Sequence, residues 1–330
     1  MVAITRATLA RQLKKSSNVK TTKTRIVKNK IIKQKKRLVK QRTVPSSSSS
    51  SSITITNKTT TSTVPLQAYN DVIGKSNITD ALAYDCHWNP VGREYDLGRD
   101  GAFMGFNILI GQFYGGISDV DMKKSIDELK MKGFQVKHIK TEDECIKELA
   151  SNQYQVAWII SNSYINNRDI ISSLTNFHSN GGGIFLFADN TPFVCHANEF
   201  LGKKFGITVE GNYHGTNTMT YQENGHREKG HFGQHEIFTG IKNLFEGITI
   251  CHPVYSTEAS REVFVPIGTA SDGNTSIAVY DPVSNSTINE GQICLDCGFT
   301  KLYCNWDSAG TARYIVNASC WLLRIENRFT

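Results

Sequence analysis

Acidic and aromatic residues are missing from the start of the sequence. Residues 1–64 contain 16 Lys and Arg but no Asp or Glu, and the first aromatic residue is Tyr69. Residues 65–330 carry a formal net charge of −9, so the overall charge of +7 hides two segments of opposite sign. Because base stacking needs aromatic side chains, any nucleic-acid binding by the basic segment is expected to be non-specific.

The basic segment also has too few apolar residues to form a core. Seven consecutive serines occupy positions 46–52, and residues 53–64 are rich in Thr. Such a composition cannot offset the entropy of ordering, so residues 1–64 are predicted to be a disordered basic arm. Three interpretations remain open for it. They are an organelle transit peptide within residues 1–15, nuclear import or contact with a polyanion such as nucleic acid through Lys33–Arg37, and a solvated tail without a partner.

Long hydrophobic runs are absent as well. No apolar run approaches the ~20 residues that a bilayer crossing needs, so no membrane span is expected. There is no hydrophobic signal segment at the N-terminus, and a body of this size does not need disulfides. The eight cysteines are therefore predicted to be reduced thiols in an intracellular protein, in the nucleus or cytoplasm rather than the mitochondrion, although a mitochondrial location stays open.

After a lead-in and linker at residues 65–105, apolar runs alternate with amphipathic segments. The runs are typical of strands, and the segments between them have helical spacing and begin at capping residues such as Ser118 and Thr141. Alternation of this kind implies parallel strands joined by right-handed crossovers. Residues 106–330 are therefore predicted to be one α/β domain, a doubly wound, flavodoxin-like, mostly parallel sheet with helices on both faces. The predicted strands are 106–111, 134–139, 156–160 and 183–187, and the predicted helices are 118–133, 141–149 and 169–177.

The second half of the domain has a looser pattern. Residues 211–233 are rich in Gly, Asn and His and are predicted to form a long loop. Short apolar runs between turn residues then predict additional edge strands, some of them antiparallel. The sequence ends in an apolar stripe at helical spacing within residues 311–323, which predicts a last helix packed on the core. The predicted later strands are 248–251, 263–267, 276–280 and 292–295.

The end of the fourth strand is the most informative passage. Thr191 can cap a helix and Pro192 can occupy its first position, which predicts a sharp strand-to-helix turn. Ligands of open α/β sheets bind beyond the carboxyl ends of the strands. A small polar ligand is therefore expected at this turn. Its candidate ligand-binding residues are Asp189, Asn190, Asn198 and His196.

Three passages resemble the class I glutamine amidotransferase-like superfamily, and most closely its ThuA-type and other poorly characterised branches. They are Gly181-Gly-Gly before the apolar strand, His235-Glu-Ile-Phe-Thr-Gly240, and Cys297-Gly-Phe-Thr-Lys-Leu302 with the segment 306–314. The resemblance covers residues 106–323. It implies a cysteine nucleophile at the sharp turn and a His and Glu pair far downstream. This sequence departs at that place, because the turn is Ala188-Asp189-Asn190-Thr191 and contains no thiol.

Cys195 is the nearest thiol to the turn. It lies about a full helical turn beyond it, and His196 cannot act as its base because consecutive helix residues point to different faces. His235 is the base that the resemblance suggests, although its acidic neighbour Glu236 is adjacent and not two positions away. Cys195 is therefore predicted to be a buried helix residue, and Asp189, Cys195 and His235 remain the candidate catalytic residues.

A histidine cluster raises a metal hypothesis. His226, His231 and His235 are spaced by five and four residues, but Gly230 and Gly233 argue against a helix that would present them together. No metal and no cofactor are therefore predicted. The sequence favours a non-catalytic binding or scaffold domain behind a basic arm that serves targeting or polyanion contact. The alternative is a hydrolase-type enzyme acting on a small polar or carbohydrate-like substrate at the end of the fourth strand.

Overall fold

The structure is a computed structural model that describes residues 83–84, 90–91, 100–282, 289–306 and 309–324. The chain divides into two units, Met1–Thr59 and Thr60–Thr330, and all described residues belong to the second. The predictions about the basic arm lie outside the described residues, as do most of those about the linker. Within the described ranges, no helix is long and apolar enough to cross a membrane.

Five parallel strands form one half of a ten-stranded sheet. Their order is β4-β3-β5-β6-β14, and every adjacent pair in it is parallel. Numbered along the chain this is the order 2-1-3-4-5 of flavodoxin-like folds, which confirms the predicted fold class. Every residue of β5 and β6 is buried, as expected for strands covered on both faces. The bounds are β3 Asn107–Gln112, β4 Gln135–Ile139, β5 Val156–Ile160, β6 Gly183–Phe187 and β14 Ile293–Asp296.

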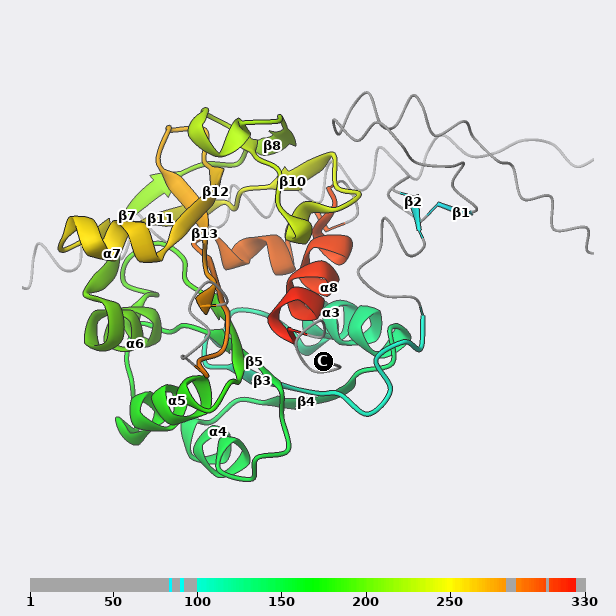
Figure 1. The fold of residues 1–330 in the computed structure, drawn as a ribbon, viewed down its shortest axis with the longest axis vertical. Helices are drawn as coiled ribbons and strands as arrows, with labels where there is room; N and C mark the ends of the chain where they lie inside the picture. The colour runs from blue at the N-terminus through cyan, green and yellow to red at the C-terminus, as the bar shows by residue number, and fades with distance from the viewer. Residues whose placement is uncertain (1–82, 85–89, 92–99, 283–288, 307–308, 325–330) are drawn as a thin grey trace, which may run out of the picture. The chain divides into compact units, whose positions relative to one another are not determined.

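Helices cover both faces of this parallel half (Figure 1). One face carries α4 (Glu142–Leu149), α5 (Asp169–Ser179) and α6 (Cys195–Phe205), which contact one another in that order. The other face carries α3 (Asp119–Met131) and α8 (Thr311–Leu322), which also touch. The predicted caps are confirmed, because the hydroxyls of Ser118 and Thr141 accept hydrogen bonds from the backbone N–H groups of Asp121 and Glu144.

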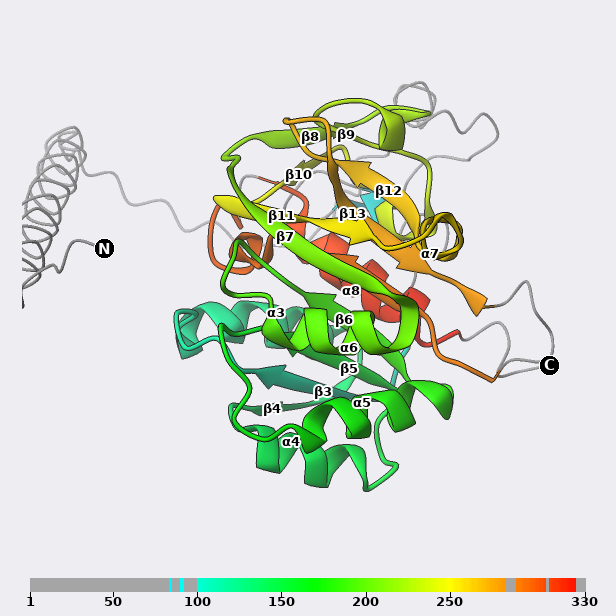
Figure 2. The same cartoon turned by 90° about the vertical axis from the view of Figure 1, so that its left-hand side faces the viewer.

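The other half of the sheet is mainly antiparallel and continues from β14. It follows the order β14-β13-β12-β9-β8-β10, in which only β8 and β9 are parallel. A separate two-stranded sheet pairs β7 with β11 and lies across β13 in Figure 2. The bounds are β7 Ile207–His214, β8 Thr218–Tyr221, β9 His231–Phe232, β10 Asn243–Phe245, β11 Thr249–Tyr255, β12 Val265–Thr269 and β13 Thr275–Tyr280.

Three local predictions are wrong. The long loop expected at residues 211–233 contains the end of β7 together with β8, a short helix η2 (Gly225–Arg227) and β9. A helix α7 (Glu258–Val263) occupies residues that include the start of an expected strand. Helix α6 begins at Cys195 and not at Pro192. Helix α7 follows a local signal, because the Thr257 hydroxyl accepts a hydrogen bond from the backbone N–H of Ser260. In the other two cases tertiary pairing outweighs local propensity. The backbone N–H of Thr191, for example, is bonded to the carbonyl of Gly211 in β7 rather than lying at a helix end.

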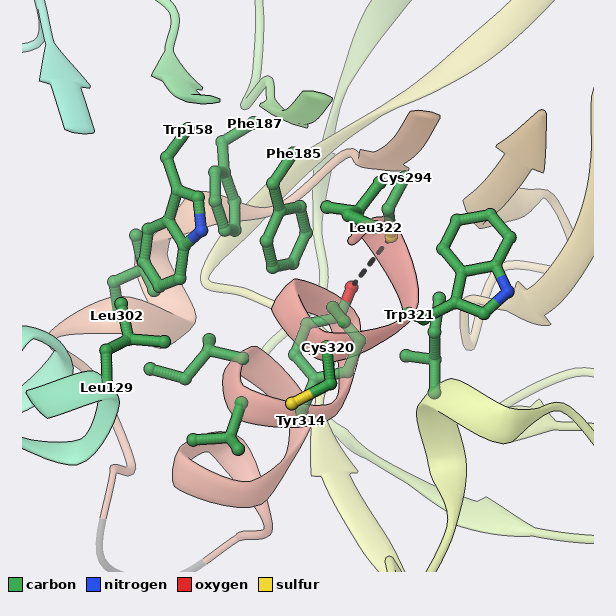
Figure 3. Close-up of a cluster of buried hydrophobic side chains, with 14 of the residues drawn as sticks. Leu129, Trp158, Phe185, Phe187, Cys294, Leu302, Tyr314, Cys320, Trp321 and Leu322 are labelled. Atoms are coloured by element: carbon green, nitrogen blue, oxygen red, sulfur yellow. Dashed lines mark hydrogen bonds between the residues drawn. The ribbon is translucent and has the colours of Figure 1, made fainter. Parts of the chain in front are cut away.

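Two hydrophobic clusters fill the space between the sheet and its helical layers, one on each face. Figure 3 shows part of the cluster beneath α8, where Trp158, Phe185 and Phe187 stand side by side on neighbouring strands. The indole N–H of Trp158 donates to the Ser319 hydroxyl at 3.1 Å. Every residue of α8 is buried, so the last helix is a central element of the core, as predicted.

Candidate ligand site at the carboxyl edge of the parallel strands

The turn after β6 is held by backbone contacts with three other segments. Ala188 N–H donates to the carbonyl of Asp296 at 2.8 Å, and Ala188 accepts from Phe299 N–H at 3.2 Å. Thr191 N–H donates to Gly211 O at 2.8 Å. The turn is therefore fixed against β14, the segment after it, and β7, which gives the side chains at positions 189 and 190 defined surroundings.

Asp189 is the buried acid of this turn, with 4% of its surface exposed. Its Oδ2 accepts a long hydrogen bond of 3.5 Å from the Thr249 hydroxyl, while its Oδ1 is buried without a partner among the described residues. Burial raises the pKa of this carboxyl to about 7, and the nearby Asp296 carboxylate adds to the rise. A backbone hydrogen bond at Asn190, the Lys301 ammonium and the Thr249 hydroxyl oppose it. The carboxyl thus has an unmet hydrogen-bonding capacity and titrates near neutral pH.

Beside Asp189, a fully buried ion pair stands at the end of β14. The Lys301 ammonium, on the short helix η5 (Phe299–Leu302), lies 2.5 Å from Oδ1 of Asp296. Tyr314 of α8 donates its hydroxyl to Asp296 Oδ2 at 2.7 Å, and Gly298 N–H donates to Oδ1 at 2.9 Å. Asp296 therefore has three charged or polar contacts on its two oxygens, which compensate for the water that burial removes from a carboxylate. The same hydroxyl of Tyr314 lies 3.9 Å from the Cys294 sulfur (Figure 3).

The Cys195 thiol is not arranged as an activated nucleophile. Its sulfur donates to the Ser163 carbonyl at 3.0 Å, and burial together with the Glu199 charge raises the pKa of the thiol. Its neighbour His196 is fully buried and has both ring nitrogens in use. Nδ1 accepts from Asn162 N–H at 3.2 Å, and Nε2 lies 3.0 Å from Glu142 Oε1. The His196 ring, stacked on Phe113 at 4.4 Å, is thus held by contacts within the core.

The two candidate asparagines differ in their surroundings. Asn190 Oδ1 accepts from the Thr249 hydroxyl at 2.8 Å, so Asn190 and Asp189 share one hydroxyl partner. Asn198 instead ties α6 to β7, because its amide donates to the carbonyl of Val209 and accepts from the backbone N–H of the same residue. The structure therefore brings Asp189, Asn190 and Thr249 together and gives Asn198 contacts within the scaffold.

His235 lies at the opposite edge of the sheet. Antiparallel pairing places Tyr280 of β13 beside Ile293, the first residue of β14, so Asp281 follows at the amino edge of the parallel strands. His235 lines a cavity with Asp281 and Trp321, whereas Asp189 follows the carboxyl end of β6. The structure does not bring His235 to Asp189 or Cys195.

The other two histidines have separate partners. Nδ1 of His231 contacts the hydroxyl and the carbonyl of Thr220 across the β8–β9 pair, and Nε2 of His226 accepts from the Arg227 side chain at 3.2 Å. Over the ranges that the structure describes, no three His, Cys, Asp or Glu side chains are placed to hold a metal ion. Seven cysteines fall in these ranges, and all are free thiols.

Sequence reasoning missed Lys301, Asp296 and Tyr314. Lys301 and Asp296 do occur in or beside the passage 297–302 that carries the resemblance, and a lysine between Phe299 and Leu302 was the available signal. Burial of the lysine and its pairing with the aspartate five residues earlier depend on how η5 folds back over β14, and no periodicity in the sequence indicates that.

Comparisons with known proteins concern the fold. No protein-family model and no curated protein matches the sequence. Among solved structures, the mmIFT52 N-terminal domain is similar at 11% identity and a TM-score of 0.46, over 66% of this chain and 96% of that one. A ThuA-like protein from Bacteroides uniformis ATCC 8492 is similar at 12% identity and a TM-score of 0.38, over 66% and 91%. The exo-β-1,4-mannosidase Op5Man5 from Opitutaceae bacterium strain TAV5 is similar at 9% identity and a TM-score of 0.40, over 67% of this chain and 36% of that one. ThuA-like proteins are thus among the structural neighbours.

Proposed function

We propose that the described domain is an amidotransferase-like fold that binds a small polar ligand at the turn after β6 and has no glutamine amidotransferase activity. The observation that carries the proposal is the chemistry of this turn. A buried carboxyl stands where the resemblance implies a thiol, and the nearest thiol donates to a backbone carbonyl and has a raised pKa. Fold alone does not assign chemistry, so the residues of the turn decide the function.

Asp189, Asn190 and Thr249 would recognise the ligand. Near neutral pH the Asp189 carboxyl interconverts between a form that donates a hydrogen bond and a form that only accepts. Asn190 and Thr249 add an amide and a hydroxyl within the same group of hydrogen bonds. Such a set suits a ligand with both donors and acceptors, for example a polyol or a primary amide. Because Oδ1 of Asp189 is buried, binding requires the side chains of the turn to rearrange.

The proposal for the basic arm rests on its sequence. With 16 basic and no acidic residues, residues 1–64 would attach the protein to a polyanion through counterion release. Binding of the full chain to duplex DNA, followed across a salt series, tests this. Affinity that does not fall with salt, or that is unchanged when residues 1–64 are removed, would contradict it.

A second candidate function is favoured by one observation. A carboxyl with a pKa near 7 is suited to general acid–base catalysis, so Asp189 could serve a hydrolase-type reaction on a small polar or carbohydrate-like substrate. Hydrolysis of p-nitrophenyl glycosides that is lost in Asp189→Asn and kept in Asp127→Asn, an exposed control on α3, would favour this function over binding alone.

Ammonia release from L-glutamine tests the main proposal. We expect the purified full chain to release no more ammonia than a blank, with no difference between the wild type and Cys195→Ala. Cys304→Ala is the matched control, because Cys304 is also a half-buried thiol with a raised pKa. Glutamine turnover that disappears in Cys195→Ala and persists in Cys304→Ala would overturn the proposal.

A further inference from the structure

A cavity of about 330 Å³ opens at the amino edge of the parallel strands, away from the turn after β6. It lies between β8, the short helix η3 (Glu236–Phe238), the residue after β13, and the last turn of α8. Its volume is within the range of small-molecule sites. The lining residues that bear on its chemistry are Tyr221, His235, Glu236, Phe238, Asp281 and Trp321.

His235 provides a hydrogen-bond donor in this cavity. Its Nδ1 accepts from the backbone N–H of Ile237 at 3.2 Å, so in the neutral ring the proton is on Nε2. Burial lowers the pKa of the imidazole to about 4, which keeps the ring neutral at pH 7, although the Asp281 charge opposes this shift. The ring stands edge-on to the Trp321 indole, with 5.3 Å between centroids. Nε2–H is therefore the donor that this lining residue can offer to a ligand.

Aromatic rings and carboxylates make up much of the remaining wall. Trp321, Tyr221 and Phe238 contribute rings, and Figure 3 shows the Trp321 indole apart from the rings of Trp158 and Phe187. Glu236 and Asp281 contribute carboxylates, and none of the described lining residues is a lysine or an arginine. Ring faces attract cations, and carboxylates in a wall favour a cationic ligand over an anionic one. Anionic ligands are therefore disfavoured, and a cation with an apolar surface suits both kinds of group.

We propose that this cavity is a second ligand site, for a small organic ammonium ion that has a hydrogen-bond acceptor close to its charge. The ammonium contacts the rings of Trp321 and Tyr221 and faces the carboxylates, while the acceptor takes the Nε2–H of His235. This site is independent of the proposed ligand at Asp189, because the two lie at opposite edges of the sheet.

Choline is the probe, because it combines a quaternary ammonium with a hydroxyl two carbons away. Titration calorimetry on the full chain should show saturable binding of choline. The uncharged isostere 3,3-dimethylbutan-1-ol should bind at least tenfold more weakly, because it fills the same volume without the charge. Glu236→Gln and Asp281→Asn should each weaken choline binding several-fold, whereas Glu262→Gln, at an exposed position on α7, should leave it unchanged.

His235→Asn tests the donor. Asn keeps an oxygen that can cap η3 but does not reproduce the ring N–H, so choline should lose affinity while tetramethylammonium, which has no acceptor, should not. Three results would overturn the proposal. They are equal binding of choline and its neutral isostere, no saturable choline binding up to tens of millimolar, and unchanged affinity in both carboxylate variants. Binding of glucose in preference to choline would assign the cavity to neutral polyols and would equally overturn it.

Discussion

Lys301 is a charged residue in a place that water does not reach. Its side chain is 1% exposed and that of Asp296 is 0% exposed, so each charge depends on the other and on the Tyr314 hydroxyl. Such a pair adds little net stability over apolar residues of the same shape. Removal of only one residue of the pair is costly, because the charge of the other then stays buried without a counter-charge. The pair therefore fixes how η5 folds over the end of β14, next to the candidate ligand turn.

The Lys301→Met variant measures this dependence. Removal of the ammonium leaves Asp296 buried and unpaired, and we expect the free energy of unfolding to fall by about 3–5 kcal/mol. Urea denaturation of the full chain, monitored by tryptophan fluorescence, gives the value. The control is Lys203→Met on the exposed side of α6, which should change stability by less than about 0.5 kcal/mol. Equal effects of the two substitutions would show that the pair has no special role.

At the scale of single residues, the sequence predicted part of the candidate ligand site after β6. Asp189 and Asn190 were found because a polar pair directly follows an apolar strand, and the structure places both beside Thr249. Thr249 itself was not found, since it comes from β11, some sixty residues away in the chain. Asn198 and His196 are polar residues near the same turn, yet their contacts are to the β7 backbone and to Glu142. Local sequence shows where polar residues occur, but not which of them use their hydrogen bonds within the protein.

At the scale of helices and strands, the close packing of β6 against α8 determines how near the last helix lies to the sheet. A Cβ on Gly183, the first residue of β6, would lie 2.3 Å from the backbone carbonyl oxygen of Leu322. Only a glycine allows the last turn of α8 to approach the sheet so closely. Gly183, the last of the three consecutive glycines at residues 181–183, thus has a packing reason in this chain.

Two glycine substitutions with opposite expected signs test this packing. Gly183→Ala should lower the free energy of unfolding by at least about 1–3 kcal/mol, because α8 must shift. Gly202→Ala, inside α6, should raise it by up to about 1 kcal/mol, because a Cβ there meets nothing closer than 3.8 Å and alanine favours the helix. Thermal or urea unfolding of both variants provides the comparison. Destabilisation by Gly202→Ala, or tolerance of Gly183→Ala, would contradict the packing described.

The parallel elements were predictable and the antiparallel ones less so, for a physical reason. Strands β5 and β6 are continuous apolar runs and have the predicted bounds, because burial on both faces leaves a strong local signal. β7, β8 and β9 lie in a stretch rich in Gly, Asn and His, and they form because distant strands pair with them. The fully buried Glu246 accepts from the backbone N–H groups of Asn217 and Ser271, and so joins the β7–β8 connection to the β12–β13 connection. Neither the pairing with distant strands nor the Glu246 hydrogen bonds can be predicted from local composition.

Considered as a whole, the molecule has a strongly basic segment and an acidic remainder. The described part of that remainder contains two candidate ligand sites, one at each edge of the parallel strands. They differ in character, because the carboxyl edge is built on a buried acid with an unmet hydrogen bond and the amino edge on aromatic rings, carboxylates and a neutral imidazole. Experiments on one should leave the other unaffected.

The pH dependence of stability tests most directly the central claim, that a buried carboxyl with a raised pKa occupies the turn after β6. The pKa of Asp189 rises from 3.8 to about 7 on folding, so the folded state holds the proton more tightly. Its contribution is fully present below about pH 4 and is lost as pH rises to about 7, by at most about 1.4 kcal/mol per pH unit.

The Asp189→Asn variant lacks this titration. The free energies of unfolding of the variant and the wild type, measured from pH 4.5 to 7.5, should therefore diverge in favour of the variant as pH rises. Asp127→Asn, which removes an exposed carboxyl on α3, should run parallel to the wild type. A constant difference between Asp189→Asn and the wild type across this range would contradict the account, since it would mean that Asp189 is ionised and well solvated in the folded protein.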